Sequence, residues 1–177
     1  LASIYSLALI GVLLIIGEII SSEFLRKVKS EKRSYWLTFG FIISIGLLTF
    51  SFTYWGNHGL GDEAMIPIGH WKTIKNINWT EYGHLEGQVT SDGNDIVTTQ
   101  FKVVDNKLCG NLDSWFYEYQ NSYFVLDLKT DTLTEFKSEA AFNVYAKANK
   151  LPKSDELLNF EQNYKNHWGG IRFFLLL

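Results

Sequence analysis

The chain has 177 residues, with 16 Lys and Arg against 19 Asp and Glu, one Cys and two Pro. These totals combine two unlike parts: residues 1–55 carry five basic and three acidic side chains, whereas residues 56–177 carry eleven basic and sixteen acidic ones. Neither part has the glycine period of collagen, the cysteine density of a disulfide scaffold, low-complexity sequence or the basic excess of a nucleic-acid-binding domain. Those classes are excluded, and we expect no nucleic-acid partner.

Two apolar stretches in the first part are each long enough to cross a bilayer. Residues 1–20 contain one charged side chain, Glu18, and residues 35–55 contain none. At a rise of about 1.5 Å per residue, a helix of twenty residues spans roughly 30 Å, the thickness of the hydrocarbon core. The pairs Tyr35-Trp36 and Tyr54-Trp55 flank the second stretch, as aromatic residues do at membrane interfaces. We predict a transmembrane helical hairpin.

The charges around these stretches predict the orientation of the hairpin. The loop 21–34 holds all five basic residues of the first part, and short basic loops stay in the cytoplasm. Residues 56–65 hold two acidic residues and no Lys or Arg. We therefore expect a two-pass protein with its N-terminus and residues 56–177 outside the cytoplasm, in the periplasm or the extracellular space. A cleaved signal peptide is the alternative for residues 1–20, although the positive charge follows the apolar run instead of preceding it.

Small and polar residues in the two apolar stretches are candidates for intramembrane packing. Gly40 and Ser44 form a small-xxx-small pair, and Gly11 and Gly17 leave the surface of the first helix without side chains at those positions. They permit close packing within the hairpin or against another subunit. Glu18 lies near the cytoplasmic end, where either a solvated carboxylate or a buried partner contact explains it. We expect the lipid bilayer and a membrane protein, or a complex of them, as partners.

The second part, residues 56–177, has the size and aromatic content of one folded domain. After a flexible glycine-containing exit at residues 56–61, short β-like runs alternate with turn signals. The expected antiparallel meander of about five strands uses runs at residues 82–90, 96–104, 115–119, 123–128 and 133–137, and residues 108–110 follow the turn after the second run.

The period of the apolar residues changes at Ser138, which can cap a helix that Pro152 ends. A second helix is expected from Ser154 to Gly169-Gly170. Residues 171–177 are apolar and too short to span a membrane, so they form a buried strand or contact the bilayer or a partner. The predicted fold is a membrane-anchored α+β protein, with helices on one face of the sheet.

Four potential metal ligands occur close together after the second apolar stretch: His58, Asp62, Glu63 and His70. Their spacing matches no helical or hairpin ligand pattern, and a polar, glycine-containing juxtamembrane loop explains the same residues. We expect no metal site there and no cofactor anywhere in the chain. His84 and His167 fall in a predicted strand and a predicted helix, where surface or core roles are expected.

Cys109 is the single cysteine, so the chain has no intrachain disulfide. Its neighbours Leu108 and Gly110 form no nucleophile elbow, and a small buried residue is the expected role. Asn78-Trp79-Thr80 matches a glycosylation sequon by pattern alone.

The aromatic strip at residues 115–124 is the best functional hint in the second part. Strand alternation places Trp115, Tyr117 and Tyr119 on one face, and Tyr123 follows in the next run. Such a face suits a ligand or partner surface if exposed, and is ordinary core if covered by helices.

Three functions follow as hypotheses. The first is a non-enzymatic accessory or interaction subunit of a membrane assembly that presents its exported domain to a partner. The second is a membrane-tethered ligand-binding or immunity-type protein that uses the aromatic strip; the sequence names no small-molecule ligand for it. The third is a metal-dependent hydrolase built on residues 58–70.

Overall fold

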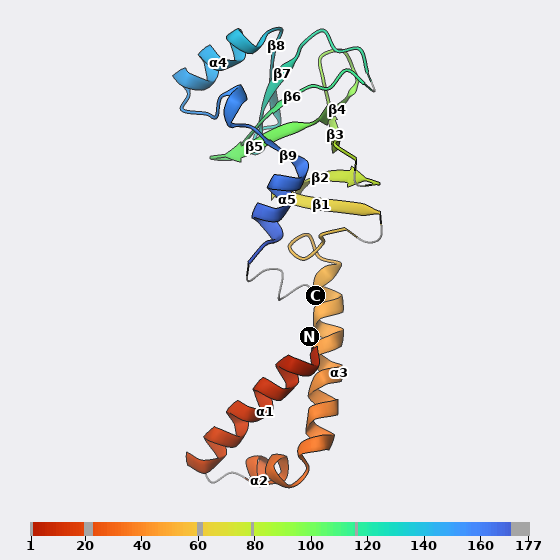
Figure 1. The fold of residues 1–177 in the computed structure, drawn as a ribbon, viewed down its shortest axis with the longest axis vertical. Coiled ribbons are helices and arrows are strands. Elements are labelled where there is room, and N and C mark those ends of the chain that lie inside the picture. The colour runs from red at the N-terminus through yellow and green to blue at the C-terminus, as the bar shows by residue number, and fades with distance from the viewer. Residues whose placement is uncertain (1, 20–22, 60–61, 79, 116, 171–177) are drawn as a thin grey trace. The chain divides into compact units, whose positions relative to one another are not determined.

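The computed structural model describes residues 2–19, 23–59, 62–78, 80–115 and 117–170 (Figure 1). The chain divides into two compact units, one within Leu1–Gly56 and one comprising Asn57–Gly169.

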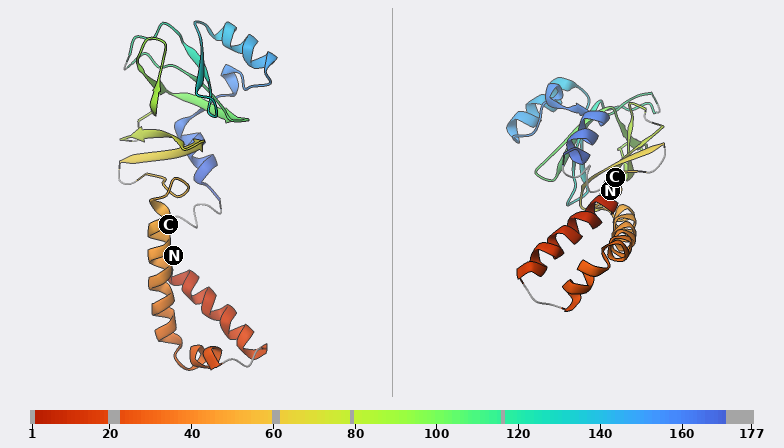
Figure 2. Two further views of the ribbon diagram at one scale, coloured as in Figure 1. Left: turned by 180° about the vertical axis from the view of Figure 1, so that it is seen from behind. Right: turned by 60° about the horizontal axis from the view of Figure 1, so that its bottom comes forward.

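The first unit is helical, with α1 (Ala2–Ile19), α2 (Glu23–Ser30) and α3 (Lys32–Ser51). Near the start of α1 this helix lies against α3 (Figure 2). Ser6 is fully buried there, and its hydroxyl donates to the carbonyl oxygen of Trp36 at 2.6 Å. A Cβ at Gly40 would lie 3.8 Å from the Cβ of Ser6, so the small residues let the two backbones approach closely.

Among the described residues, α3 is the one helix that is long and apolar enough to cross a membrane. An apolar helix near the N-terminus with this length and composition is either a membrane span or a signal sequence. The described apolar run of α1, Ile4–Ile16, is shorter: its thirteen residues reach roughly 20 Å, less than a hydrocarbon core. The predicted hairpin of two spanning helices is therefore not supported.

The second unit contains two antiparallel sheets. The strands of the first follow the order β1 (Glu63–Gly69), β2 (Lys72–Ile77), β3 (Gly83–Val89) and β4 (Asp95–Thr98). The order in the second is β8 (Thr132–Phe136), β7 (Tyr123–Asp127), β6 (Lys107–Asn111), β5 (Gln100–Val104) and β9 (Leu158–Asn159).

Both sheets bury apolar side chains in one common core. Ile74 and Leu85 of the first sheet belong to the same buried cluster as Phe101 and Phe124 of the second. Burying the inner faces of two sheets against each other removes far more apolar surface from water than either sheet buries alone. The two sheets therefore form one folding unit.

Two helices complete this unit. Helix α4 (Glu139–Ala148) begins at Ser138, whose hydroxyl accepts from the amide of Ala141, and packs Phe142 on β7 and β8. A 3₁₀ turn, η1 (Ser154–Glu156), precedes α5 (Phe160–Trp168), which packs on β1 and β5. The indole N–H of Trp168 donates to the carbonyl of Met65 at 2.7 Å.

The α+β class is confirmed, with two antiparallel sheets and five helices in the described residues. The predicted strand at residues 96–104 is wrong as one element, because it divides at Thr99 into β4 and β5 of different sheets. The prediction also lacks β1 and β2, and it starts the last helix too early: residues 158–159 pair with β5, so α5 begins at Phe160. Residues 171–177 lie outside the described residues.

Asp127 organises the turn between β7 and β8. Its Oδ1 accepts from the amides of Lys129 and Thr130, and its Oδ2 accepts from Lys107 Nζ at 3.3 Å. These bonds favour the ionised form, so the pKa of Asp127 falls from 3.8 to about 2.

We predict that Asp127→Asn removes part of the acid sensitivity of the fold. A carboxyl group with a lowered native pKa stabilises the protein above its unfolded pKa, and that contribution disappears as the pH falls through about 2. Thermal unfolding should show the variant to be less stable than wild type at pH 6, with the difference shrinking below pH ~4. Asp105→Asn, in another turn, is the control; an equal pH trend in both variants contradicts the assignment.

Candidate functional site

The chain passes from the first sheet to the second at Thr99, and one side chain fixes this corner. Asn111 Oδ1 accepts from the backbone amides of Thr99 at 3.1 Å and Gln100 at 2.8 Å. Asn111 Nδ2 donates to the hydroxyl of Thr99 at 2.7 Å. Asn111 ends β6, so it links the corner directly to the loop that follows it.

That loop, residues 112–122, joins β6 to β7 and is held at several points by hydrogen bonds. Its ends meet through the amide of Leu112, which donates to the carbonyl of Ser122 at 2.9 Å. The amide of Asp113 donates to Val97 O, and the amide of Gln120 donates to Asp92 Oδ2. The predicted strand at residues 115–119 is therefore wrong: the described residues of this segment belong to no strand, and the bonds of the loop run to β4 and to the β3–β4 turn.

Tyr119 anchors the loop to β4. Its hydroxyl donates to the carbonyl of Asp95 at 2.6 Å and accepts from the amide of Val97 at 3.2 Å. Partial burial raises the pKa of Tyr119 to about 12, so the hydroxyl keeps its proton at neutral pH. Tyr117 lies beside it, with ring centroids 5.9 Å apart and its hydroxyl 3.5 Å from Asp95 Oδ2.

Trp115 differs from these tyrosines because 77% of it is exposed. Its amide donates to Asp113 Oδ1 at 2.9 Å, which fixes the backbone while the indole faces solvent. Tyr123 lies on β7 with its ring stacked on Phe142 of α4 at 4.9 Å, which makes it a packing residue. The aromatic strip thus contains an exposed ring, two half-buried anchors and a ring against a helix; Phe116 lies outside the described residues.

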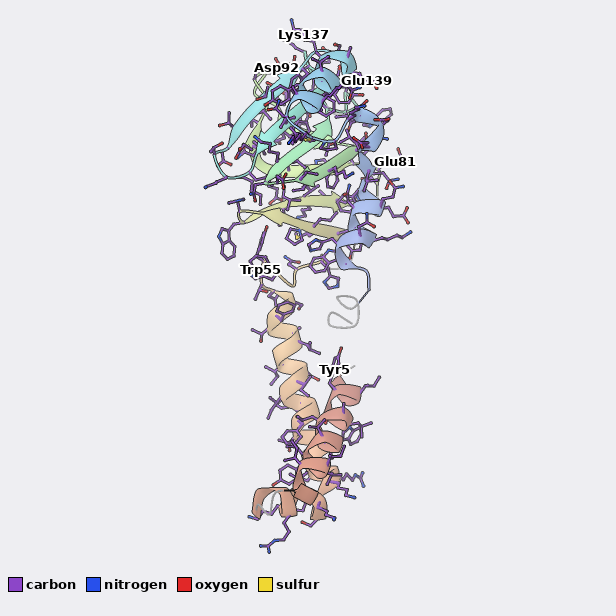
Figure 3. The ribbon with its side chains drawn as sticks, turned by 90° about the vertical axis from the view of Figure 1, so that its left-hand side faces the viewer. Tyr5, Trp55, Glu81, Asp92, Lys137 and Glu139 are labelled. Carbon is purple, nitrogen blue, oxygen red and sulfur yellow. The ribbon has the colours of Figure 1, made fainter. Side chains whose placement is uncertain are left out.

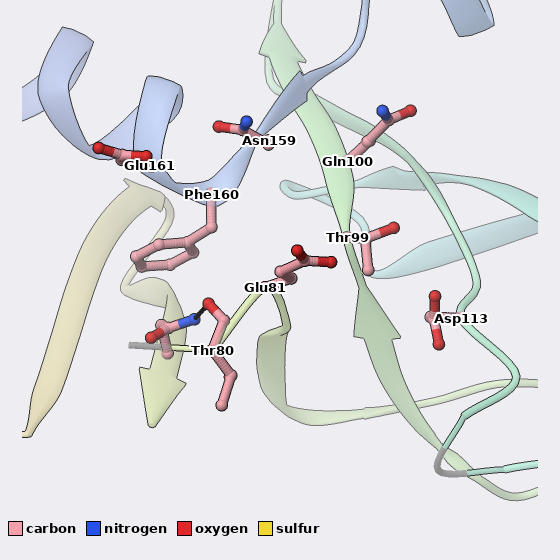
Figure 4. Close-up of a pocket in the computed structure, with 9 residues that line it drawn as sticks. Thr80, Glu81, Thr99, Gln100, Asp113, Asn159, Phe160 and Glu161 are labelled. Atoms are coloured by element: carbon pink, nitrogen blue, oxygen red, sulfur yellow. Dashed lines mark hydrogen bonds between the residues drawn. The ribbon is translucent and has the colours of Figure 1, made fainter. Parts of the chain in front are cut away.

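Beside this loop is a hollow of about 660 Å³ within the second unit (Figure 4). The β2–β3 connection, the β4–β5 corner, Asp113 and the start of α5 form its walls. It is lined by Asn76, Thr80, Glu81, Thr99, Gln100, Asp113, Asn159, Phe160 and Glu161. The lining therefore holds three carboxylates and no Lys or Arg. Glu161 pairs with Lys165 at 2.5 Å, with both side chains exposed to solvent.

Asn76 lines the same hollow and is fully buried. Its Nδ2 donates to the carbonyls of Thr80 and Tyr82, each at 2.7 Å, which fixes the orientation of the side-chain amide. Its Oδ1 is buried and has no hydrogen-bond partner within the described ranges. Buried polar atoms are rarely left unpaired, so this oxygen is an exception among the described residues.

Two stretches of the sequence that contribute to the loop and the hollow contain acidic but no basic residues. No Lys or Arg occurs between Lys75 and Lys102 or between Lys107 and Lys129, whereas seven Asp and Glu residues do. Tyr82 lies near these carboxylates: its pKa is raised mainly by partial burial, and further by the negative charges of Asp113 and Glu81. Burial outweighs Asp95 and Glu86 at His84, whose pKa is lowered, so this imidazole is neutral at pH 7.

The structure does not bring the proposed metal ligands together. Glu63 begins β1 and pairs with Lys75 at 3.0 Å, whereas His70 lies at the far end of the same strand, roughly 23 Å away at the rise of a β-strand. His70 Nε2 lies 3.1 Å from Asn106 Oδ1, and the His58 ring lies 6.0 Å from Trp168. Within the described ranges, no group of three or more His, Cys, Asp and Glu side chains has the geometry of a metal site.

The remaining candidates have structural surroundings. Cys109 is fully buried on β6, and burial raises the pKa of its thiol to about 12. His167 lies on α5 with its ring 4.5 Å from Trp168. Gly40 contacts α1 as described above, whereas the Ser44 hydroxyl donates to the Gly40 carbonyl of its own helix, and Gly11 has open space around it. The side-chain surroundings of Gly17 and Glu18 lie outside the described residues.

Trp71 is a second tryptophan of this unit that is 77% exposed. It lies with His70 in the two-residue β1–β2 turn, where both residues have positive φ angles of 63° and 51°. The charges near this turn differ from those at Trp115, because Lys72 pairs with Asp131 at 2.6 Å. Trp71 therefore provides a matched reference for Trp115: the same ring and exposure, in a different electrostatic setting.

Sequence patterns indicate Trp115 but not Glu81, Asp113, Asn76 or Asn111. Glu81 and Asp113 lie in the stretches without Lys or Arg, and this charge pattern is the sequence signal that indicates them. Asn76 and Asn111 act through bonds to segments that only the fold brings near them.

We predict that Trp115→Ala leaves the stability of the domain nearly unchanged, within about 2 °C in melting temperature, because little apolar surface is lost. Tyr119→Phe should cost about 1 kcal/mol, because the Asp95 and Val97 groups lose their partner. Thermal unfolding of the detergent-solubilised protein measures both. A large loss for Trp115→Ala would instead place this ring in the core.

Comparison with known proteins gives no relative: no protein-family model, no curated protein and no solved structure matches the chain.

Proposed function

We propose that this protein is a membrane-anchored, non-enzymatic interaction protein, and that its Asn57–Gly169 unit binds a partner protein through the loop 112–122. The observation that carries the proposal is Trp115, whose ring is 77% exposed on a backbone held by hydrogen bonds. Exposed tryptophans are enriched among the residues that dominate binding energy. A loop ordered before binding loses little conformational entropy when the partner docks.

The hydrogen bonds around the loop support this proposal. The side chain of Tyr119 and the backbone groups of Leu112, Asp113 and Gln120 are all used to hold the loop in place. Trp115 takes part in the anchor through its backbone amide, so its side chain can be removed without loosening the loop. The loop is thus held by groups other than the Trp115 indole, which leaves the indole available for contact with a partner.

The membrane anchor is the second part of the proposal. We propose that α3 spans the membrane, that α1 enters it as well, and that the basic segment 21–34 faces the cytoplasm with the Asn57–Gly169 unit outside. The support is the apolar length of α3, the buried Ser6–Gly40 contact with α1 and the basic residues between the two helices.

The binding loop is tested by site-specific photocrosslinking in cells. We predict that p-benzoylphenylalanine in place of Trp115 gives a discrete crosslinked product in the native membrane. The same group in place of Trp71 is the control, because both rings are 77% exposed on the same unit. Equal products from both positions, or none from position 115, contradict the proposal.

The topology is tested by labelling engineered cysteines. Cys109 is buried with a pKa raised to about 12, so its thiol gives little background with maleimides. We predict that Val144→Cys, on an exposed position of α4, reacts with a membrane-impermeant maleimide in intact cells. Ser30→Cys should react only after permeabilisation; the reverse pattern overturns the orientation.

A further inference from the structure

We infer that the partner bound by this loop is a positively charged polypeptide segment, whose Lys or Arg side chains contact Trp115 and the carboxylates of Glu81, Asp95 and Asp113. The inference rests on the proposed function and adds the chemistry of the partner to it. It is carried by the charge around the loop, the position of Trp115 next to Asp113, and the hollow that shares Asp113 with the loop.

Three carboxylates lie near one another beside the loop. Asp95 and Asp113 flank Tyr119, and Glu81 and Asp113 flank Tyr82, so the three carboxylates belong to one neighbourhood. Asp92 also lies in a stretch without Lys or Arg, but Figure 3 shows it at a separate place on the unit from Glu81. In the described residues, Glu81, Asp95 and Asp113 form no ion pair with Lys or Arg. A cationic segment is the partner that complements this surface, whereas an acidic segment or a nucleic acid is repelled.

Trp115 and Asp113 present two complementary groups for the same kind of side chain. The Asp113 carboxylate is bonded to the amide of Trp115, so the charge and the ring are held two residues apart. The face of an indole attracts Lys ammonium and Arg guanidinium groups, and Trp is the strongest aromatic partner for them. A carboxylate fixed beside an exposed indole therefore favours cations over neutral groups.

The hollow gives a second cationic side chain a place to enter. Asp113 lines it together with Glu81, which lies between Phe160 and Thr99 in the view of Figure 4. Ammonium and guanidinium groups carry only N–H donors, so they match a lining that contains the carboxylates of Glu81 and Asp113.

Binding of a labelled peptide to the full-length protein in neutral detergent tests the inference. The probe alternates Gly and Arg; peptides of equal length that alternate Gly with Glu or with Ser are the references. We expect the Gly-Arg peptide alone to bind, and its affinity to fall as NaCl rises from about 50 to about 300 mM. Glu81→Gln with Asp113→Asn, and Trp115→Ala separately, should each weaken it by about tenfold or more.

The control variant changes the charge by the same amount elsewhere. Asp105→Asn with Asp155→Asn removes two exposed carboxylates from other elements, and Trp71→Ala removes an equally exposed indole. These variants should stay within about twofold of wild type, as changes outside the binding surface do. An equal loss in the control variants overturns the inference, because net charge alone then explains binding. If spermine binds as tightly as the Gly-Arg peptide, the claim that the partner is a polypeptide is wrong.

Failure of this inference is distinguishable from failure of the proposed function. If position 115 crosslinks to a partner but the Gly-Arg peptide binds no better than the Gly-Ser peptide, the interaction function stands and the cationic partner is wrong. If position 115 gives no product and the peptide does not bind, both are wrong.

Discussion

The hydrogen bonds of Asn111 are the constraint on which the rest of the second unit depends. A two-sheet core forms only if the chain turns sharply from β4 into β5, and this turn takes a single residue, Thr99. The turn leaves the amides of Thr99 and Gln100 without strand partners of their own, and Asn111 Oδ1 accepts from both. One amide side chain thereby satisfies the corner and fixes where β6 ends.

The interaction surface follows from that corner. Because the loop 112–122 leaves directly from Asn111, its start is as well placed as the core beneath it, and Tyr119 returns to bind the backbone of β4. The same corner contributes Thr99 and Gln100 to the hollow that Asp113 also lines. The corner therefore explains the order at the base of the loop, while Trp115 remains 77% exposed.

Local signals in the sequence predict some elements of the fold correctly. Elements whose position depends on contacts between distant segments cannot be predicted in this way. The Ser138 cap and the runs that form β7 and β8 were found, because hydrogen-bonding side chains and alternation act locally. The corner at Thr99 has no local sequence signal, because the side chain that fixes it belongs to Asn111, twelve residues further on. Trp115 was selected as a candidate, but by a strand alternation that the chain does not have. The segment lacks a strand because its hydrogen bonds go to β4 and Asp92 instead of a neighbouring ladder.

The most direct test of this account is amide hydrogen exchange in the loop of the unbound full-length protein. If the loop is ordered before it meets a partner, the hydrogen-bonded amides of Asp113, Trp115 and Gln120 should be protected from exchange. We predict protection of about 100-fold or more over an unstructured chain, because exchange then requires local opening of the loop. Exchange at the unstructured rate, with β6 and β7 still protected, would contradict the claim that the loop is a preformed surface.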